Sequence, residues 1–319
     1  MKPRTKLLAH LEMMRPYTLF HSGTLGFASA LFISEGQAQP WRLGLAFLVP
    51  TLGWLAGLYA GDYYDRDLDA AAKPHRPVPS GRVGAREAFA FMVGYIALGY
   101  VLALILSPFA LLLAVITTVF GIAYSKTFKR HAILGNLDRG LLACLTVLFA
   151  GATVHGLGAC LSLALLCGIF FFHDSSSNLI GAIRDVEGDR ESGYRTMPVA
   201  HGVYFSILIS GLMTLSWLAF GLPLFAYYHE RTVSLALFVV ALLMTGLAYF
   251  MLLAHRGRLT REQALGAHKM VVLERLVLSA AVATIFGPTL PVLILLGVVL
   301  SATQLAQMLM RDRYEFDSA

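Results

Sequence analysis

The sequence predicts an all-α, polytopic membrane protein, a bundle of about nine transmembrane helices around a central cavity open at the cytoplasmic face. Two observations predict this fold class. The 319 residues are 57% hydrophobic and only 14% charged, with a mean hydropathy of +0.67, whereas about a quarter of a soluble chain is charged. Apolar runs long enough to cross a hydrocarbon core of about 30 Å also recur along the whole chain.

The apolar runs follow one another with short polar connections. Alternation of polar and apolar residues with period two is absent, so we expect helices rather than a barrel. Pro288 and Pro291 leave open whether the last run is one kinked helix or two, which would give a tenth crossing. The expected spans are 17–35, 42–61, 86–106, 109–125, 133–154, 158–182, 203–228, 232–254 and 271–300 or beyond.

The distribution of positive charge predicts the orientation. With the N-terminus inside, 21 of the 25 Lys and Arg residues fall in cytoplasmic segments. We therefore expect the N-terminus to be cytoplasmic, since Met1 to Pro16 also lack the pattern of a cleaved signal peptide. Topology accounts for the net charge of +6, and nothing indicates nucleic-acid binding.

Two acidic stretches follow the second and sixth spans, on the same predicted side of the membrane. Asp62, Asp65 and Asp69 step by three and four residues, which places them on one helix face, and Asp185 and Asp189 share a face in the same way. Opposed across a cavity, these carboxylates would repel one another unless cations neutralised them. Oxygen ligands and substrate phosphates suit Mg²⁺, so the pattern is typical of a diphosphate site.

The sixth span extends the second acidic stretch into the membrane. Asp174, Asn178, Asp185 and Asp189 drift little around a helix and predict one polar stripe facing a cavity. The alternative for Asp174 and its neighbour His173 is a structural hydrogen-bond network between helices.

Basic and aromatic residues on the same side supply the other groups that such a site needs. Arg76 and Arg184 adjoin the acids and are expected to contact phosphate, as are Lys126 and Arg130. We attribute Lys129 and Arg139 to the orientation bias alone. Tyr124, at the end of the fourth span, either faces a cation with its ring or belongs to an interfacial aromatic belt.

The motifs resemble those of the UbiA superfamily of intramembrane prenyltransferases, and the resemblance covers nearly the whole chain. It is closest to the branch that contains digeranylgeranylglyceryl phosphate synthase and chlorophyll synthase. One departure is that the first motif of the family usually opens with Asn, where this chain has Gly61. The matching segments are Asp62-x-x-Asp65-x-x-x-Asp69, Arg76-Pro-Val-Pro-Ser-Gly, Tyr124-Ser-Lys126-Thr-Phe-Lys129-Arg130 and Arg184-Asp185-x-x-Gly188-Asp189.

The resemblance implies a single domain over residues 1–319 that binds an isoprenyl diphosphate through Mg²⁺ and transfers its prenyl group to an acceptor. The implied metal ligands and catalytic acids are Asp62, Asp65, Asp69, Asp185 and Asp189. Asn178 joins the basic residues as a diphosphate contact. The acceptor, aromatic or lipid, stays open, as do prenyl chain length and oligomeric state.

Two alternatives remain from the sequence. A membrane terpene cyclase of the same superfamily would use no external acceptor, and Gly61 keeps this option open. A transporter of anionic lipids would carry charges in the middle of several spans, whereas the charges here cluster at one side. The sequence therefore favours the enzyme.

Overall fold

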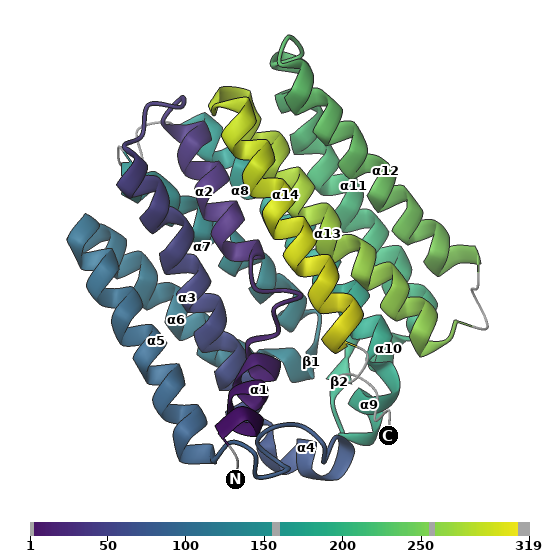
Figure 1. Ribbon diagram of the computed structural model, residues 1–319. Coiled ribbons are helices and arrows are strands. Elements are labelled where there is room, and N and C mark those ends of the chain that lie inside the picture. Colours follow the sequence, from purple (N-terminus) through teal and green to yellow (C-terminus); the bar gives the residue numbers. More distant parts are fainter. Residues whose placement is uncertain (1–2, 155–159, 255–258, 312–319) are drawn as a thin grey trace.

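Long helices pack side by side into one bundle in the computed structural model, which describes residues 3–154, 160–254 and 259–311 (Figure 1). The predicted all-α fold is confirmed. Residues 155–159, which include the expected start of the sixth span at 158, lie outside the described residues. The long helices are α2 (His21–Ile33), α3 (Pro40–Tyr64), α5 (Ala85–Leu106), α6 (Pro108–Lys126), α7 (Leu134–Val154), α8 (Cys160–Arg184), α11 (Val203–Tyr227), α12 (Thr232–Ala254), α13 (Arg261–Phe286) and α14 (Thr289–Ala306).

Eight helices in the described part of the chain are long and apolar enough to cross a membrane. Large apolar side chains point outward from them, as with Leu215 at 63%, Leu243 at 68% and Phe250 at 67% exposure. Such surfaces are unfavourable in water and favourable in lipid. The chain is therefore an integral, multi-pass membrane protein.

Local sequence signals set where several helices begin. Pro40 and Pro108 occupy the first turns of α3 and α6, where a missing amide proton costs nothing. Ser107 caps α6 by accepting a hydrogen bond from the amide of Ala110, and Thr260 forms a capping box with Gln263 at the start of α13.

The first expected span is realised as a short helix. The α2 helix has 13 residues, about 20 Å at 1.5 Å per residue, whereas the apolar run covers 17–35. The residues from Pro16 to Phe20 instead form a turn that leads into α2 beside the acidic motifs.

The last expected span is two helices. A break at Gly287 and Pro288 separates α13 from α14, because proline removes a helical hydrogen bond. The α13 helix also carries the buried pair Glu274 and Arg275, and it is not among the eight apolar spans. The open question about the last run is thus resolved in favour of two helices.

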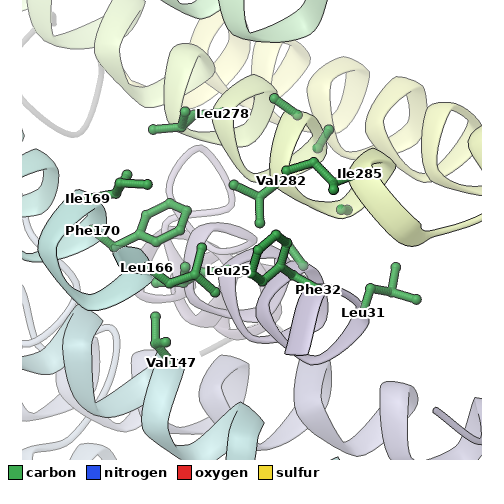
Figure 2. Close-up of a cluster of buried hydrophobic side chains, with 14 of the residues drawn as sticks. Leu25, Leu31, Phe32, Val147, Leu166, Ile169, Phe170, Leu278, Val282 and Ile285 are labelled. Carbon is green, nitrogen blue, oxygen red and sulfur yellow. The ribbon is translucent and has the colours of Figure 1, made fainter. Parts of the chain in front are cut away.

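The main hydrophobic core lies where α2, α7, α8 and α13 meet. Phe32 of α2, Val147 of α7, Phe170 of α8 and Val282 of α13 point toward one another in this cluster (Figure 2). Close approach there depends on small residues, since a Cβ at Gly140 would lie 2.4 Å from the carbonyl oxygen of Phe171.

The short elements gather at one end of the bundle (Figure 1). A parallel bridge there pairs His131 with Arg195 and Ala132 with Thr196, which joins two distant loops. These elements are α1 (Pro3–Met14), α4 (Arg66–Ala72), η1 (Phe128–Arg130), β1 (His131–Ala132), α9 (Val186–Glu191), β2 (Arg195–Thr196), α10 (Met197–His201) and the π-helical turn η2 (Gln307–Arg311).

Candidate active site

Both acidic motifs lie at the same end of the bundle and border one cavity. The first spans the junction of α3 and α4, and the second spans the junction of α8 and α9 (Figure 1). Asp65, Asp69, Asp185 and Asp189 line a cavity of about 450 Å³. Asp62 is buried and is not among the lining residues described; it forms an ion pair with Arg15.

The backbone turns at the same position in each motif. Asp65 has φ −92° and ψ 0°, and Asp185 has φ −94° and ψ 5°, which are values of the sparsely populated bridge region. The expected continuous helices therefore break at these residues. Main-chain hydrogen bonds still continue across each break, from the amide of Asp69 to the carbonyl of Asp65 and from that of Asp189 to that of Asp185.

Basic and hydroxyl groups hold the carboxylates of the first motif. Asp65 pairs with Lys129, accepts a hydrogen bond from the Tyr194 hydroxyl at 3.0 Å and lies 3.7 Å from Arg130. Asp69 accepts a hydrogen bond from Arg76 at 2.8 Å.

The two carboxylates of the second motif have opposite electrostatics. Burial opposes ionisation of Asp185, but the adjacent Arg184 guanidinium, which donates to it at 2.9 Å, holds the pKa of this carboxyl below its usual range. Burial and the nearby Asp185 carboxylate raise the pKa of Asp189 to about 7, although Thr196 donates to Asp189 at 3.0 Å. The negative charge of an ionised Asp189 would therefore be stabilised by a cation bound beside it.

Tyr124 and Asn178 lie together on the cavity wall. The Asn178 amide donates to the Tyr124 hydroxyl at 3.3 Å and accepts from the Asn136 amide at 2.9 Å. The Arg139 guanidinium lies 5.8 Å from the centre of the Tyr124 ring. The predicted stripe from Asp174 through Asn178 to Asp185 and Asp189 lines the cavity along its whole length.

The basic residues divide differently from the expectation. Arg76 and Arg184 line the cavity, as does Lys129, which we had attributed to membrane orientation. Lys126 is exposed, and its ammonium nitrogen lies 5.0 Å from the centre of the Tyr64 ring. Neither Lys126 nor Arg130 is among the described residues that line the cavity. Lys129 and Arg130 both lie beside Asp65.

Several lining residues were not predicted as site residues. Lys73 acts electrostatically on both Asp185 and Asp189, and Tyr194 reaches Asp65 from the loop of the second motif. Lys73 follows the first motif directly, a signal that was available. Tyr194 gave none, because its approach depends on how two distant loops pack.

A second polar cluster lines the cavity on α2, α7, α8 and α13. Asp174 lies 3.1 Å from Arg139, 3.5 Å from Arg275 and 3.2 Å from His21, all by nitrogen to oxygen distances. Arg139 in turn stacks 4.4 Å from the ring centre of Trp54. We call His21, Arg139, Asp174 and Arg275 the floor cluster. The alternative of a structural network for Asp174 is realised, yet all four residues also line the cavity.

The donor set fits Mg²⁺ rather than a softer metal. The acids offer only oxygen ligands, and no group of three His, Cys, Asp or Glu side chains converges to hold an ion alone within the described residues. Mg²⁺ commonly takes one or two carboxylates and completes its shell with water and substrate phosphate.

Comparison with known proteins agrees with this geometry. Residues 23–273 match the model of the UbiA prenyltransferase family. The chain is similar to the digeranylgeranylglyceryl phosphate synthase of Natronomonas pharaonis, with 33% identity over 214 residues, which is 67% of this chain and 76% of the relative.

Solved structures show the same fold. A UbiA homologue from Aeropyrum pernix K1 superposes with a TM-score of 0.69 at 18% identity, over 91% of this chain and 98% of that one. A UbiA homologue from Archaeoglobus fulgidus bound to DMAPP and Mg²⁺ superposes with a TM-score of 0.54 at 16% identity, over 93% and 99%. The chain therefore belongs to the UbiA prenyltransferase family, and it is an intramembrane prenyltransferase.

Proposed function

We propose that the two acidic motifs hold Mg²⁺ and the diphosphate of an isoprenyl donor, and that the prenyl group then passes to a lipid acceptor. The observation that carries the proposal is that Asp65 and Asp69 share one cavity with Asp185 and Asp189. Bound Mg²⁺ would neutralise charge on the leaving diphosphate. The Archaeoglobus fulgidus homologue bound to DMAPP and Mg²⁺ supports the choice of metal and of donor class.

The residues of the chain have distinct parts in binding the donor. The proposed metal ligands are Asp65, Asp69, Asp185 and Asp189. Asp62 contributes indirectly, because it forms an ion pair with Arg15, which lines the cavity. Arg76, Lys129 and Arg184 now neutralise these acids. When a cation takes over that task, the three basic groups become available to phosphate oxygens, where they stabilise the charge that develops as the C–O bond breaks.

The wall beyond the acids excludes water from the reacting carbon. Tyr124 lines the cavity, Asn178 donates to its hydroxyl, and Asn136 in turn donates to Asn178. The face of an aromatic ring attracts a cation, which suits a carbon that gains positive charge as diphosphate leaves. Lys126 would have to leave the Tyr64 ring to reach the diphosphate, and we assign it no part in binding.

The proposed acceptor is a glyceryl phosphate lipid. Two relatives that are 33% and 31% identical to this chain over the aligned residues are digeranylgeranylglyceryl phosphate synthases. The positive-inside distribution supports a cytoplasmic location for the N-terminus and the aspartate end.

The experiment is incubation of the purified protein with Mg²⁺ and prenyl diphosphates of five to twenty carbons, with and without a glyceryl phosphate monoether lipid. Mass spectrometry of the products then identifies the reaction. We expect a lipid product that contains the added prenyl group and needs both Mg²⁺ and the acceptor. Cyclic hydrocarbons without acceptor would support the cyclase alternative that Gly61 keeps open.

A further inference from the structure

We propose that His21 binds the acceptor's hydroxyl group and takes up its proton as the new C–O bond forms. The inference rests on the prenyl transfer proposed above. It extends that transfer by assigning the acceptor-activating residue and by specifying an oxygen acceptor rather than an aromatic carbon.

The position of His21 suits this role. It is the first residue of α2, it lines the same cavity as the aspartates, and only 4% of its surface is exposed. Its Nε2 lies 3.2 Å from Asp174 Oδ1. Because a carboxylate only accepts hydrogen bonds, Nε2 carries the proton and the lone pair is on Nδ1. That Nδ1 atom is buried and has no hydrogen-bond partner within the described residues.

Asp174 is fixed in an orientation that serves His21. Arg139 of α7 and Arg275 of α13 lie 3.1 Å and 3.5 Å from its carboxylate oxygens. Two guanidiniums keep this carboxylate in place and in its acceptor form. A carboxylate behind a histidine orients the ring and stabilises the imidazolium that forms when the histidine takes a proton. Asp174 is therefore a positioning residue.

A matching donor lies beside His21. The Trp54 ring of α3 meets the His21 ring edge to face, with ring centres 5.8 Å apart, and its indole Nε1 also lacks a partner within the described residues. An indole N–H is a donor only, and Nδ1 of this histidine is an acceptor only. A hydroxyl group donates and accepts, so one hydroxyl would satisfy both buried atoms. A prenyl chain or an aromatic carbon would satisfy neither.

The step balances without a further reagent. The bond between the prenyl carbon and the diphosphate oxygen breaks, and its electron pair leaves with the diphosphate. The acceptor oxygen forms the new bond to that carbon, and its proton moves to Nδ1 of His21. The imidazolium then returns the proton to the departing diphosphate, which the aspartate end of the same cavity holds.

The test compares His21→Gln with His173→Gln in the purified, Mg²⁺-loaded enzyme. Glutamine can still donate to Asp174 but takes up no proton at neutral pH. His173 is the matched control, because it forms a buried pair with Glu274 at 2.6 Å and is not among the described residues lining the cavity. The substrates are geranylgeranyl diphosphate and a glyceryl phosphate monoether lipid with a free hydroxyl, at pH values from about 4 to 9.

We expect His21→Gln to lower kcat by about 100-fold or more, the usual size of a lost general base. The KM for the diphosphate should stay within about twofold of wild type. With Mg²⁺ kept saturating at every pH, so that Asp189 contributes no pH dependence, the remaining fall in kcat on the acid side should disappear. His173→Gln should keep that acid limb. A His21→Gln enzyme with wild-type kcat and the acid limb intact would overturn the inference.

A second variant covers the case in which glutamine unfolds the protein. His21→Ala leaves space for added imidazole, which should restore part of the activity, and more of it as pH rises. Absence of rescue in a protein that still binds geranylgeranyl diphosphate would overturn the inference. Wild-type transfer to a carbon of an aromatic acid, with none to the lipid hydroxyl, would also overturn it and leave prenyl transfer intact. If wild-type protein transferred to no acceptor, the proposed function itself would fail.

Discussion

The hydroxyl of Tyr194 donates a hydrogen bond to Asp65 Oδ1 at 3.0 Å, across 129 positions of sequence. The bond joins the first acidic motif to the loop that follows the second. The parallel bridge between His131–Ala132 and Arg195–Thr196 ties the same loop to the segment after α6. The two motifs are thus fastened together in the metal-free protein, so a diphosphate meets a site that is already assembled.

This contact predicts a measurable loss of stability in Tyr194→Phe. Burial and the Asp65 carboxylate raise the pKa of Tyr194, so its hydroxyl stays protonated and donates at all working pH values. Its removal should cost about 1 kcal/mol. Denaturation in detergent measures the cost, with Tyr227→Phe as the control because Tyr227 is 79% exposed. Equal stability of the two variants would contradict the structural role of the bond.

Lys129 and Lys126 form a matched pair for diphosphate binding. Lys129 contacts Asp65 inside the cavity, and Lys126 lies over Tyr64 outside it. We expect Lys129→Gln to raise the KM for the prenyl diphosphate about tenfold, the loss of one charged hydrogen bond. Lys126→Gln should change this KM by about twofold or less. A larger rise in KM for Lys126→Gln than for Lys129→Gln would mean that Lys126 contacts the diphosphate, as the sequence suggested, and would contradict the assignment from the structure.

The raised pKa of Asp189 predicts that Mg²⁺ binding strengthens with pH. Below its pKa of about 7 this carboxyl is protonated in the metal-free protein. The proton must leave before the oxygen can ligate a cation, so the apparent Kd for Mg²⁺ should fall as pH rises from 6 to 8. Calorimetry in two buffers of different ionisation enthalpy would detect the released proton. A constant Kd without proton release would show that Asp189 is not a ligand.

Gly61→Asn tests the departure from the family pattern. A Cβ at Gly61 meets no atom within 4 Å, and the residue lines the cavity, so an asparagine side chain has room. Its amide oxygen would add one hard ligand near the first motif. We expect a folded protein that reaches half-maximal activity at a lower Mg²⁺ concentration. An unchanged or higher requirement would mean that Gly61 suits this chain's own metal geometry.

Much of the fold could be predicted from the sequence, because helices that cross a membrane consist of long runs of apolar residues. The acids were found because Asp65, Asp69, Asp185 and Asp189 follow helical spacing. The turns at Asp65 and Asp185 were not predicted, because neither position carries a glycine or proline, the residues that usually indicate the end of a helix. The break before α14 was only an open alternative, since hydrophobicity continues on both sides of Pro288.

The rest of the site depends on tertiary packing. A basic residue near a membrane surface has the same sequence signature whether it binds phosphate or merely sets orientation, so Lys129 and Arg139 could not be recognised. The floor cluster joins residues from four helices, and Arg275 meets Asp174 across about a hundred positions. No local pattern in a single sequence predicts such a meeting.

The most direct test of the account is diphosphate release by Asp65→Asn and Asp189→Asn, each measured with Mg²⁺ and the cognate prenyl diphosphate. Each substitution keeps the size of the side chain and removes the negative charge of a proposed metal ligand in one of the two motifs. We predict a loss of about 100-fold or more in each variant, with fold and membrane insertion retained. Release at the wild-type rate in either variant would contradict the claim that the two motifs act on one diphosphate.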